Sequence, residues 1–399
     1  MDIVFTDEQH RLIDEMLYWF KNKTKPYYSY TGCPGTGKTT VIKEFINQAN
    51  LSEDDYIACA YVGKAVLRML QSGLRAITIH SLIYHTIIES VYDDENEDIN
   101  GNTKRKTKMK FELRDTLKFP VDLIIVDEAP MVNDKMIEEI LSFGIPVIFC
   151  GDTDQLPPIF GVSSVMMYPD FRLTKIMRQS EDDPIVFLSR AYLDGRDVPY
   201  GKYGLSEVIE EYPVDSSTIR DYDQILCGKN ATRDYINNTI RAEVLHRKNI
   251  DPVIGDKVIC RQNNWDLDLN GIYLTNGLIG FITDLSKSRA SKGCMKINFQ
   301  PDFMDSEFEN IPLDLKYIRS NYALRNNWGI SKFEKFEYGY AITTHLSQGS
   351  EYPKVLFYDE YFNDKEFLRR LRYTAISRAK DAVTIVIKKP KKPYWLMNS

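Results

Sequence analysis

Residues 32–39 read Gly32-Cys33-Pro34-Gly35-Thr36-Gly37-Lys38-Thr39 and match the pattern G-x-x-x-x-G-K-[S/T] without a mismatch. The glycines let backbone N–H groups curl around the β- and γ-phosphates of a nucleotide. Lys38 then adds a positive charge, and Thr39 offers an oxygen to magnesium. Residues 27–30 before the stretch are strand-like, and residues 40–46 after it are helix-like. This context predicts a phosphate-binding loop, in preference to a chance glycine-rich turn.

A second segment supplies two acids. Residues 123–128 form an apolar run that ends in Asp127 and Glu128. Such a run predicts a buried strand with two carboxylates at its carboxyl end. Asp127 would then help to hold the metal ion, and Glu128 would polarise the attacking water. The two segments together predict that the chain binds a nucleoside triphosphate with Mg²⁺ and hydrolyses it.

Composition sets outer bounds on the class of protein. The chain has 399 residues, 43% of them apolar, which suggests two or three domains with real cores. Its net charge of −6 argues weakly against coating nucleic acid by bulk charge but leaves room for a local basic groove. No long uncharged apolar run and no secretory signal are visible, so no membrane span is expected. The six cysteines lack C-x-x-C spacing, which predicts reduced, buried thiols in a cytoplasmic protein.

Apolar strand-like runs alternate with helical patterns through the first 180 residues. This first pattern predicts strands at 56–60, 121–126 and 145–150, and helices near 64–70 and 134–142. A second α/β pattern begins near Pro184. It predicts a strand at 224–227, a long helix at 231–247, and strands at 355–358 and 383–387. Such alternation indicates mostly parallel sheets with helices on both faces.

Two stretches interrupt the alternation. Residues 91–110 carry an acidic run followed by a basic run, which indicates either a solvated loop or hairpin, or a small insertion that touches the substrate. Residues 253–335 are rich in strand-like runs, separated by Asn-Gly turn signals at Asn270-Gly271 and Asn276-Gly277. They predict a small, barrel-like insertion.

Polar segments near other strands add candidates for the site. Gln155, just after the predicted strand at 145–150, would lie beside the phosphate loop and sense a γ-phosphate, or else belong to an ordinary surface turn. Arg178 and Arg378 would stabilise transition-state charge if a second lobe delivered them to the nucleotide. Each taken alone would be an ordinary surface arginine. His345 stands in residues 338–351, where its polar neighbours are spaced about one helical turn apart.

In chain order, these segments resemble the motifs of superfamily 1 helicases of the RecD-like branch, superfamily 1B, which includes the Dda-type helicases. The resemblance extends from about residue 5 to residue 387. The adenine-sensing motif and motifs I, Ia, Ib, II, III, IV, V and VI correspond to residues 5–9, 32–39, 60–65, 78–82, 127–130, 151–157, 173–179, 344–351 and 373–380. Pro130 departs from the pattern, because the branch often has serine there.

The resemblance implies an α/β fold of two RecA-like P-loop NTPase lobes, with a small insertion in lobe 1 and a β-rich, SH3-like insertion in lobe 2. Lobe 1A would comprise residues 1–180 and contain a small 1B insertion at about 84–118. Lobe 2A would comprise residues 181–252 and 336–399. The SH3-like insertion 2B would comprise residues 253–335, and would either wall the path of a nucleic-acid strand or pad the second lobe.

The resemblance also implies roles for individual residues. The implied catalytic residues are Lys38, Glu128, Gln155, Arg178 and Arg378. The implied ATP-binding residues are Gln9, Gly32, Pro34, Gly35, Thr36, Gly37, Lys38, Thr39, Thr40, Gly349 and Glu351. The implied Mg²⁺ ligands are Thr39 and Asp127. The implied DNA-binding residues are Tyr61, Lys64, Thr78, His80, Thr344 and His345.

The function implied is that of an ATP-dependent DNA helicase or translocase that moves 5′ to 3′ on single-stranded DNA and unwinds forked duplexes. The family default is a monomer, acting in DNA replication, repair or recombination beside the proteins of those processes. One alternative is a single-strand translocase that displaces proteins or acts on RNA with little unwinding. Another is a nucleotide-gated binding module, against which the presence of Glu128 and both arginines argues.

Overall fold

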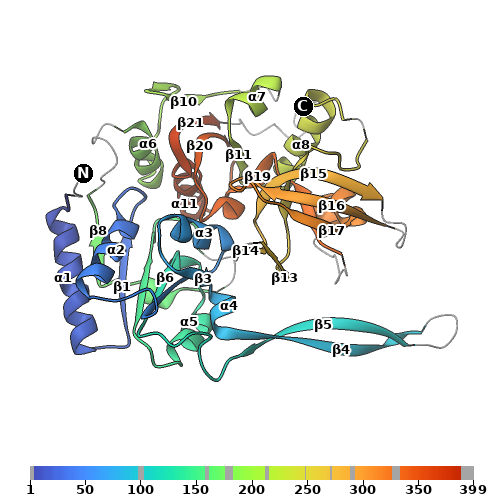
Figure 1. Cartoon of the computed structure of the whole chain (residues 1–399). Helices are drawn as coiled ribbons and strands as arrows, with labels where there is room; N and C mark the ends of the chain where they lie inside the picture. The colour runs from blue at the N-terminus through green and yellow to red at the C-terminus, as the bar shows by residue number, and fades with distance from the viewer. Residues whose placement is uncertain are drawn as a thin grey trace.

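The computed structural model of the chain describes residues 4–97, 103–157, 161–175, 183–211, 215–247, 249–269, 272–287, 293–325 and 333–387. Two α/β lobes lie against each other, a β-rich insertion packs beside the second lobe, and a long two-stranded ribbon extends from the first (Figure 1). Within the described ranges, no helix has the length and apolar character needed to cross a membrane. All six cysteines lie in the described ranges, are buried and form no disulfide, as predicted.

A six-stranded parallel sheet forms the centre of lobe 1, with strand order β3-β2-β6-β7-β1-β8. Its strands are β1 (Tyr27–Gly32), β2 (Tyr56–Ala60), β3 (Ala76–Thr78), β6 (Leu123–Asp127), β7 (Val147–Gly151) and β8 (Phe171–Leu173). The helices of this lobe are α1 (Asp7–Asn22), α2 (Lys38–Gln48), α3 (Gly63–Gln71), α4 (Ile79–Ile83) and α5 (Asp134–Leu141). Alternate residues of β6 enter separate cores on the two faces: Ile125 packs with α1 and α2, and Ile124 with α4 and α5. Burial on both faces explains the continuous apolar runs of these strands.

Lobe 2 contains the second six-stranded sheet, ordered β19-β11-β20-β21-β10-β9, in which only β9 pairs antiparallel. Its strands are β9 (Gly201–Tyr203), β10 (Ser206–Ile209), β11 (Gln224–Cys227), β19 (Ala341–Thr343), β20 (Tyr352–Asp359) and β21 (Ala379–Ile387). Its helices are α6 (Pro184–Leu193), α7 (Ser216–Asp221), α8 (Asn230–Thr239) and α11 (Lys365–Ile376). The two sheets and their helices confirm the predicted two-lobed α/β class.

The long helix predicted at 231–247 is shorter in the structure. Helix α8 passes into a π-helical turn, η3 (Ile240–Val244), and the chain then leaves the helix, with His246 in the left-handed region at φ 53°. Arg241 and Arg247 both form ion pairs with the fully buried Asp256. Because both arginines must reach one carboxylate, the chain turns where helical periodicity alone would continue.

The insertion is built on a five-stranded antiparallel sheet with order β17-β16-β15-β12-β18 and a separate hairpin, β13–β14. The strands of the sheet are β12 (Lys257–Cys260), β15 (Ile279–Lys287), β16 (Cys294–Pro301), β17 (Phe308–Asp314) and β18 (Phe336–Tyr338). The hairpin joins β13 (Asn264–Leu269) to β14 (Ile272–Leu274), and two short helices follow β17: α9 (Leu315–Arg319) and α10 (Tyr322–Arg325). The predicted β-rich insertion is thus present, and its similarity to an SH3 fold stays a prediction.

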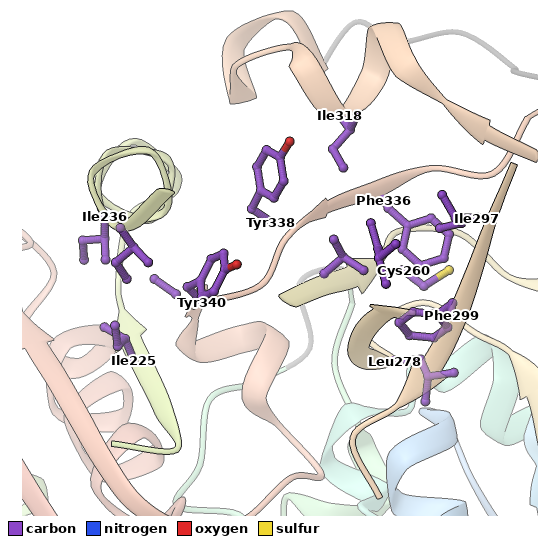
Figure 2. Packing of buried hydrophobic residues seen from close by; sticks show 14 of the residues in the cluster. Ile225, Ile236, Cys260, Leu278, Ile297, Phe299, Ile318, Phe336, Tyr338 and Tyr340 are labelled. Carbon is purple, nitrogen blue, oxygen red and sulfur yellow. The ribbon is translucent and has the colours of Figure 1, made fainter. Parts of the chain in front are cut away.

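The insertion and lobe 2 share one hydrophobic core. Figure 2 shows Tyr338 and Tyr340 between Ile225 of lobe 2 and Phe336 of the insertion. Leu67 on α3 of lobe 1 belongs to the same cluster. The insertion is therefore packed against both lobes.

The ribbon consists of β4 (Tyr84–Glu97) and β5 (Thr103–Leu113), which pair antiparallel and project from lobe 1 (Figure 1). Its register sets acidic positions opposite basic ones, for example Glu89 opposite Lys108 and Asp93 opposite Lys104. Opposite charges at paired positions favour such a hairpin. Of the alternatives for residues 91–110, the described residues 91–97 and 103–110 belong to the paired strands of a hairpin, and contact with a substrate stays a prediction.

A buried carboxylate ties lobe 2 to the insertion. Glu337 in β18 forms ion pairs with Arg233 of α8, at 2.9 Å, and with Arg261, at 3.2 Å. Burial would raise the pKa of Glu337, but the guanidinium groups around it outweigh burial and hold that pKa below its usual value. A carboxyl group with a lowered folded-state pKa stabilises the fold above its unfolded-state pKa, and the stabilisation is lost as the pH falls through the lowered value.

We therefore expect Glu337→Gln to lower the free energy of unfolding at pH 7 by about 3–5 kcal/mol, because it leaves buried guanidinium groups without their counter-charge. Urea unfolding followed by circular dichroism measures the free energy of unfolding. The difference in this free energy between the variant and the wild type should become smaller as the pH falls through the lowered pKa of Glu337. The matched control is Glu309→Gln, because Glu309 on β17 is exposed. This substitution should change the free energy of unfolding by less than about 0.5 kcal/mol. Equal effects of the two substitutions would contradict a structural role for the buried charge.

Candidate active site

The phosphate loop connects the end of β1 to the start of α2. Gly35 and Gly37 both have φ at 82°, a left-handed conformation that favours glycine. The Lys38 ammonium group folds back over the loop and donates to the carbonyl oxygens of Gly32, at 2.7 Å, and Cys33, at 3.2 Å. Thr36 Oγ1 donates to the same Cys33 oxygen at 2.8 Å. The loop is thus held in shape by its own polar groups.

Gln9 connects helix α1 to this loop. Thr6 and Gln9 form a capping box at the start of α1, and Gln9 Nε2 donates to the Thr36 carbonyl oxygen at 3.0 Å. A Cβ atom at Gly37 would lie 2.5 Å from Gln9 Nε2. Glycine is therefore favoured at position 37 for two reasons: the backbone is left-handed there, and a side chain would collide with Gln9.

The acidic pair lies at the carboxyl end of β6, as predicted. Asp127 Oδ1 accepts from the backbone N–H of Glu128 at 2.9 Å, and Glu128 itself has a left-handed φ of 52°. Such backbone conformations in non-glycine residues cost free energy and cluster at functional sites. Both carboxylates are nearly buried.

Arg68 on α3 is a member of the site that the sequence reasoning missed. Its Nη2 lies 3.1 Å from Asp127 Oδ2 and 3.0 Å from Glu128 Oε1. Burial lowers the pKa of Arg68, but the surrounding carboxylates outweigh burial and raise that pKa above its usual value. The signal was available in helical spacing: Arg68 follows Lys64, a predicted site residue, by one turn on the same helix.

The segment after β7 joins the lobes. Asp152 Oδ2 accepts from Gln155 Nε2 at 3.1 Å and from the hydroxyl of Tyr373, on α11 of lobe 2, at 2.8 Å. Burial raises the pKa of the Asp152 carboxyl. The backbone N–H of Leu156 also donates to Thr374 Oγ1 at 2.9 Å. Gln155 is therefore held between the two lobes.

Arg378 reaches the cavity beside the phosphate loop from lobe 2. Its side chain is only 2% exposed, and its guanidinium donates to the carbonyl oxygens of Ser350, at 3.1 Å, and Thr374, at 3.2 Å. A cavity of about 220 Å³ collects residues from both lobes. Its lining consists of Pro34, Gly35, Gly37, Lys38, Thr39, Thr40, Arg68, Asp127, Glu128, Gln155, Glu351 and Arg378.

A few predicted nucleotide-site residues lie elsewhere. Gly32 and Thr36 form hydrogen bonds within the loop: the Gly32 carbonyl oxygen accepts from Lys38, and the Thr36 hydroxyl donates to Cys33. Gln9 contacts the loop by donating to the Thr36 carbonyl oxygen. Gly349 lines a larger neighbouring cavity together with Glu351. Arg178 lies outside the described residues.

The predicted DNA-binding residues fall into separate groups. Tyr61 and His80 lie 5.5 Å apart between ring centroids, and His80 lies 5.4 Å from Phe111 at the base of the ribbon. Burial lowers the pKa of His80. Tyr61 is 41% exposed and Phe111 is 39% exposed, so this aromatic cluster presents two accessible rings. Thr78, in contrast, caps helix α4 by accepting from the Ser81 N–H at 3.2 Å.

The other three predicted DNA-binding residues, Thr344, His345 and Lys64, form contacts within the protein. Thr344 is fully buried, and its hydroxyl donates to the Cys227 carbonyl oxygen at 3.2 Å. His345 stacks on Phe367 with ring centroids 5.9 Å apart, and burial lowers the pKa of His345. Lys64 is not part of the Tyr61 cluster, since its Nζ lies 3.4 Å from the hydroxyl of Tyr352 in lobe 2.

Fold and cavity together define a two-lobed P-loop protein. A family model described as an AAA domain matches residues 20–161, and one described as a UvrD-like helicase C-terminal domain matches residues 338–386. The ATP-dependent RecD2 DNA helicase of Deinococcus radiodurans is 24% identical over 380 residues, which cover 88% of this chain and 45% of that protein. The chain thus spans less than half the length of this relative.

Solved helicase structures share the fold. The structure of two coordinating Pif1 helicases at forked double-stranded DNA has a TM-score of 0.56 at 18% identity, and covers 99% of this chain and 96% of its own. The Bacteroides Pif1 helicase in complex with ADP-AlF₃ and single-stranded DNA has a TM-score of 0.53 at 18% identity, and covers 100% and 96%. The matching family models and the similarity to RecD2 support the resemblance to RecD-like, superfamily 1B helicases that the order of the motifs indicates.

The loop geometry yields a test of nucleotide binding. We expect Gly37→Ala to weaken binding of a fluorescent ADP analogue by at least about tenfold, the equivalent of one lost hydrogen bond in the cradle. The matched control is Gly73→Ala, because Gly73 has a similar φ of 84° but no atom within 4 Å of its added Cβ. Fluorescence titration measures both. Unchanged binding in the Gly37 variant would contradict the steric argument.

Proposed function

We propose that this chain couples ATP hydrolysis to 5′-to-3′ movement along single-stranded DNA and to the unwinding of forked duplexes. The observation that carries the proposal is the cavity of about 220 Å³ in which Lys38, Glu128 and Arg378 meet. A site assembled from two lobes changes when they separate. Hydrolysis there is thereby coupled to relative motion of the lobes.

The proposed chemistry follows from charge and position. Glu128 accepts a proton from the attacking water, the water oxygen bonds to the γ-phosphorus, and the bond to the β–γ bridging oxygen breaks. Lys38 and Arg378 stabilise the negative charge that develops on the phosphate oxygens, a contribution of up to about 10³–10⁵ in rate for such arginines. Gln155 senses the γ-phosphate, and Arg178 is proposed as a further cation.

A magnesium ion fits the oxygen donors of this site. Thr39 and Asp127 offer a hydroxyl and a carboxylate, which are ligands of the hard type that Mg²⁺ prefers, and both line the cavity. The ion pairs that Arg68 forms with Asp127 and Glu128 indicate that these carboxylates attract positive charge. When bound, Mg²⁺ would offset the charge of the β- and γ-phosphate oxygens.

The DNA path is proposed from the aromatic cluster and from the relatives. Tyr61 and Phe111, which both contact His80, offer exposed rings for base stacking, worth about 1–3 kcal/mol per base and tolerant of any sequence. The β4–β5 ribbon would part the strands, and the insertion 2B at 253–335 would wall their path. The division into lobe 1A at 1–180 and lobe 2A at 181–252 and 336–399 belongs to the same proposal. Binding to forked DNA is supported by the Pif1 structure named above.

Lys38→Ala should reduce ATP turnover by at least about 10²-fold, the scale of removing one preorganised charge-stabilising donor. Phosphate release with and without single-stranded DNA measures it, and DNA binding should survive. Lys43→Ala is the control, because Lys43 is exposed on the same helix. Substantial hydrolysis in the Lys38 variant would show that the catalytic site lies elsewhere.

Strand displacement tests the polarity. With ATP and Mg²⁺, the wild-type chain should separate forked DNA that carries a 5′ single-stranded loading tail, and should fail on a duplex with only a 3′ tail. ATP turnover should rise when single-stranded DNA is added. Displacement from the 3′ tail alone would reverse the proposed direction, and turnover indifferent to DNA would favour a nucleotide-gated binding module.

A further inference from the structure

A second, larger cavity adjoins the nucleotide site. Its volume is about 870 Å³, and it lies among α3 of lobe 1, the starts of β11 and β20 in lobe 2, and the insertion. Arg68 and Glu351 line both this cavity and the nucleotide cavity. Because Arg68 contacts Glu128, the shared wall stands at the end of the nucleotide site where the γ-phosphate would be.

Positive charge dominates the lining of this cavity. Four lining cations have carboxylate partners: Arg68 with Asp127 and Glu128, Arg220 with Asp221, Arg247 with Asp256, and Lys380 with Glu351. The other three cations in the lining are Lys64, Lys257 and Lys354. Among the described residues, none of these three lysines forms an ion pair with a carboxylate. Four acids, Asp221, Asp223, Asp302 and Glu351, also line the cavity, so its seven lining cations exceed its lining acids by three.

Two of these lysines are held in place by neutral groups. Lys257 Nζ donates to the Asp223 carbonyl oxygen at 2.8 Å and to Gln224 Oε1 at 3.0 Å. Lys64 Nζ donates to the Tyr352 hydroxyl and lies 5.7 Å from the centre of its ring. Burial lowers the pKa of each lysine to about 8, and the positive charge of Lys64 further lowers that of Lys257, although Asp302 opposes the shift. An anion in the cavity would relieve this cost of desolvated positive charge.

We propose that this cavity is an oxyanion site that receives inorganic phosphate as it leaves the nucleotide site, with Arg68 as the residue between the two. The proposal rests on the proposed function for the source of the phosphate. The γ-phosphate end of the nucleotide site borders the cavity, whereas Gln9, the proposed adenine contact, does not line it. Tyr61 and His80, which belong to the proposed base-stacking cluster, do not line it either.

The first experiment tests the site without ATP. Inorganic phosphate is titrated into the nucleotide-free chain by calorimetry, and Lys257→Met should bind it at least about tenfold more weakly, as expected for one lost charge-assisted hydrogen bond. Lys296→Met is the control, because Lys296 is exposed on β16 of the same insertion and does not line the cavity. Equal phosphate affinity in wild type and Lys257→Met would overturn the proposal.

The second experiment asks whether the hydrolysis product uses the site. Quenched-flow measures ATP cleavage, and a fluorescent phosphate sensor measures release in the same turnover. In Lys257→Met, release should lag behind cleavage by about tenfold, since the charge that draws phosphate out is lost. Release that keeps pace with cleavage as in wild type would overturn the exit route, even if free phosphate binds.

A second variant and the titration without ATP distinguish misfolding, failure of the proposed function and absence of the oxyanion site. If Lys257→Met loses its native circular dichroism spectrum, Lys354→Met replaces it, because Lys354 is exposed and lines the same cavity. If the wild-type chain cleaves no ATP, the proposed function fails. In that case the titration of phosphate alone still decides whether the oxyanion site exists.

Discussion

The carboxylate of Asp152 is the constraint on which the assembly of the site depends. It is almost fully buried, and a buried carboxylate is costly unless hydrogen-bond donors surround it. Two donors, the Gln155 side chain and the backbone N–H of Asp154, come from its own lobe, and a third, the hydroxyl of Tyr373, comes from lobe 2. Satisfying Asp152 therefore brings the lobes together. Arg378 follows Tyr373 at the end of α11, and the same contact sets Arg378 against the nucleotide cavity.

Arg68 has the complementary role on the other side of the cavity. Its guanidinium stands against Asp127 and Glu128, so the acidic pair is partly neutralised in this structure. It also forms part of the wall between the nucleotide cavity and the basic cavity. Helix α3 is held in that position by close packing: a Cβ atom on Gly349 of lobe 2 would lie 2.9 Å from the Val62 side chain. A shift of α3 would thus change both cavities.

Much of the fold could be predicted because the signals are local. The buried strand β6 was evident from its apolar run, and the loop before α2 from its glycine spacing. The end of the helix after α8 was not predicted, because it depends on Asp256, a residue outside the helix that pairs with Arg241. The same holds for Arg68, whose importance comes from acids about sixty residues away in the chain.

The sequence by itself determined the chemistry that the chain carries: a phosphate loop, an acidic pair and their order among the family motifs. These depend on neighbours within a few residues, where backbone conformation and side-chain type are directly linked. Only the tertiary structure decided which charges meet. It set Arg68 on the acids, gave Lys257 hydrogen bonds to neutral groups and no carboxylate ion pair among the described residues, and joined Tyr373 to Asp152. Such pairings arise from packing between elements that are far apart in the chain, and the spacing of residues along the sequence does not determine the distances between them.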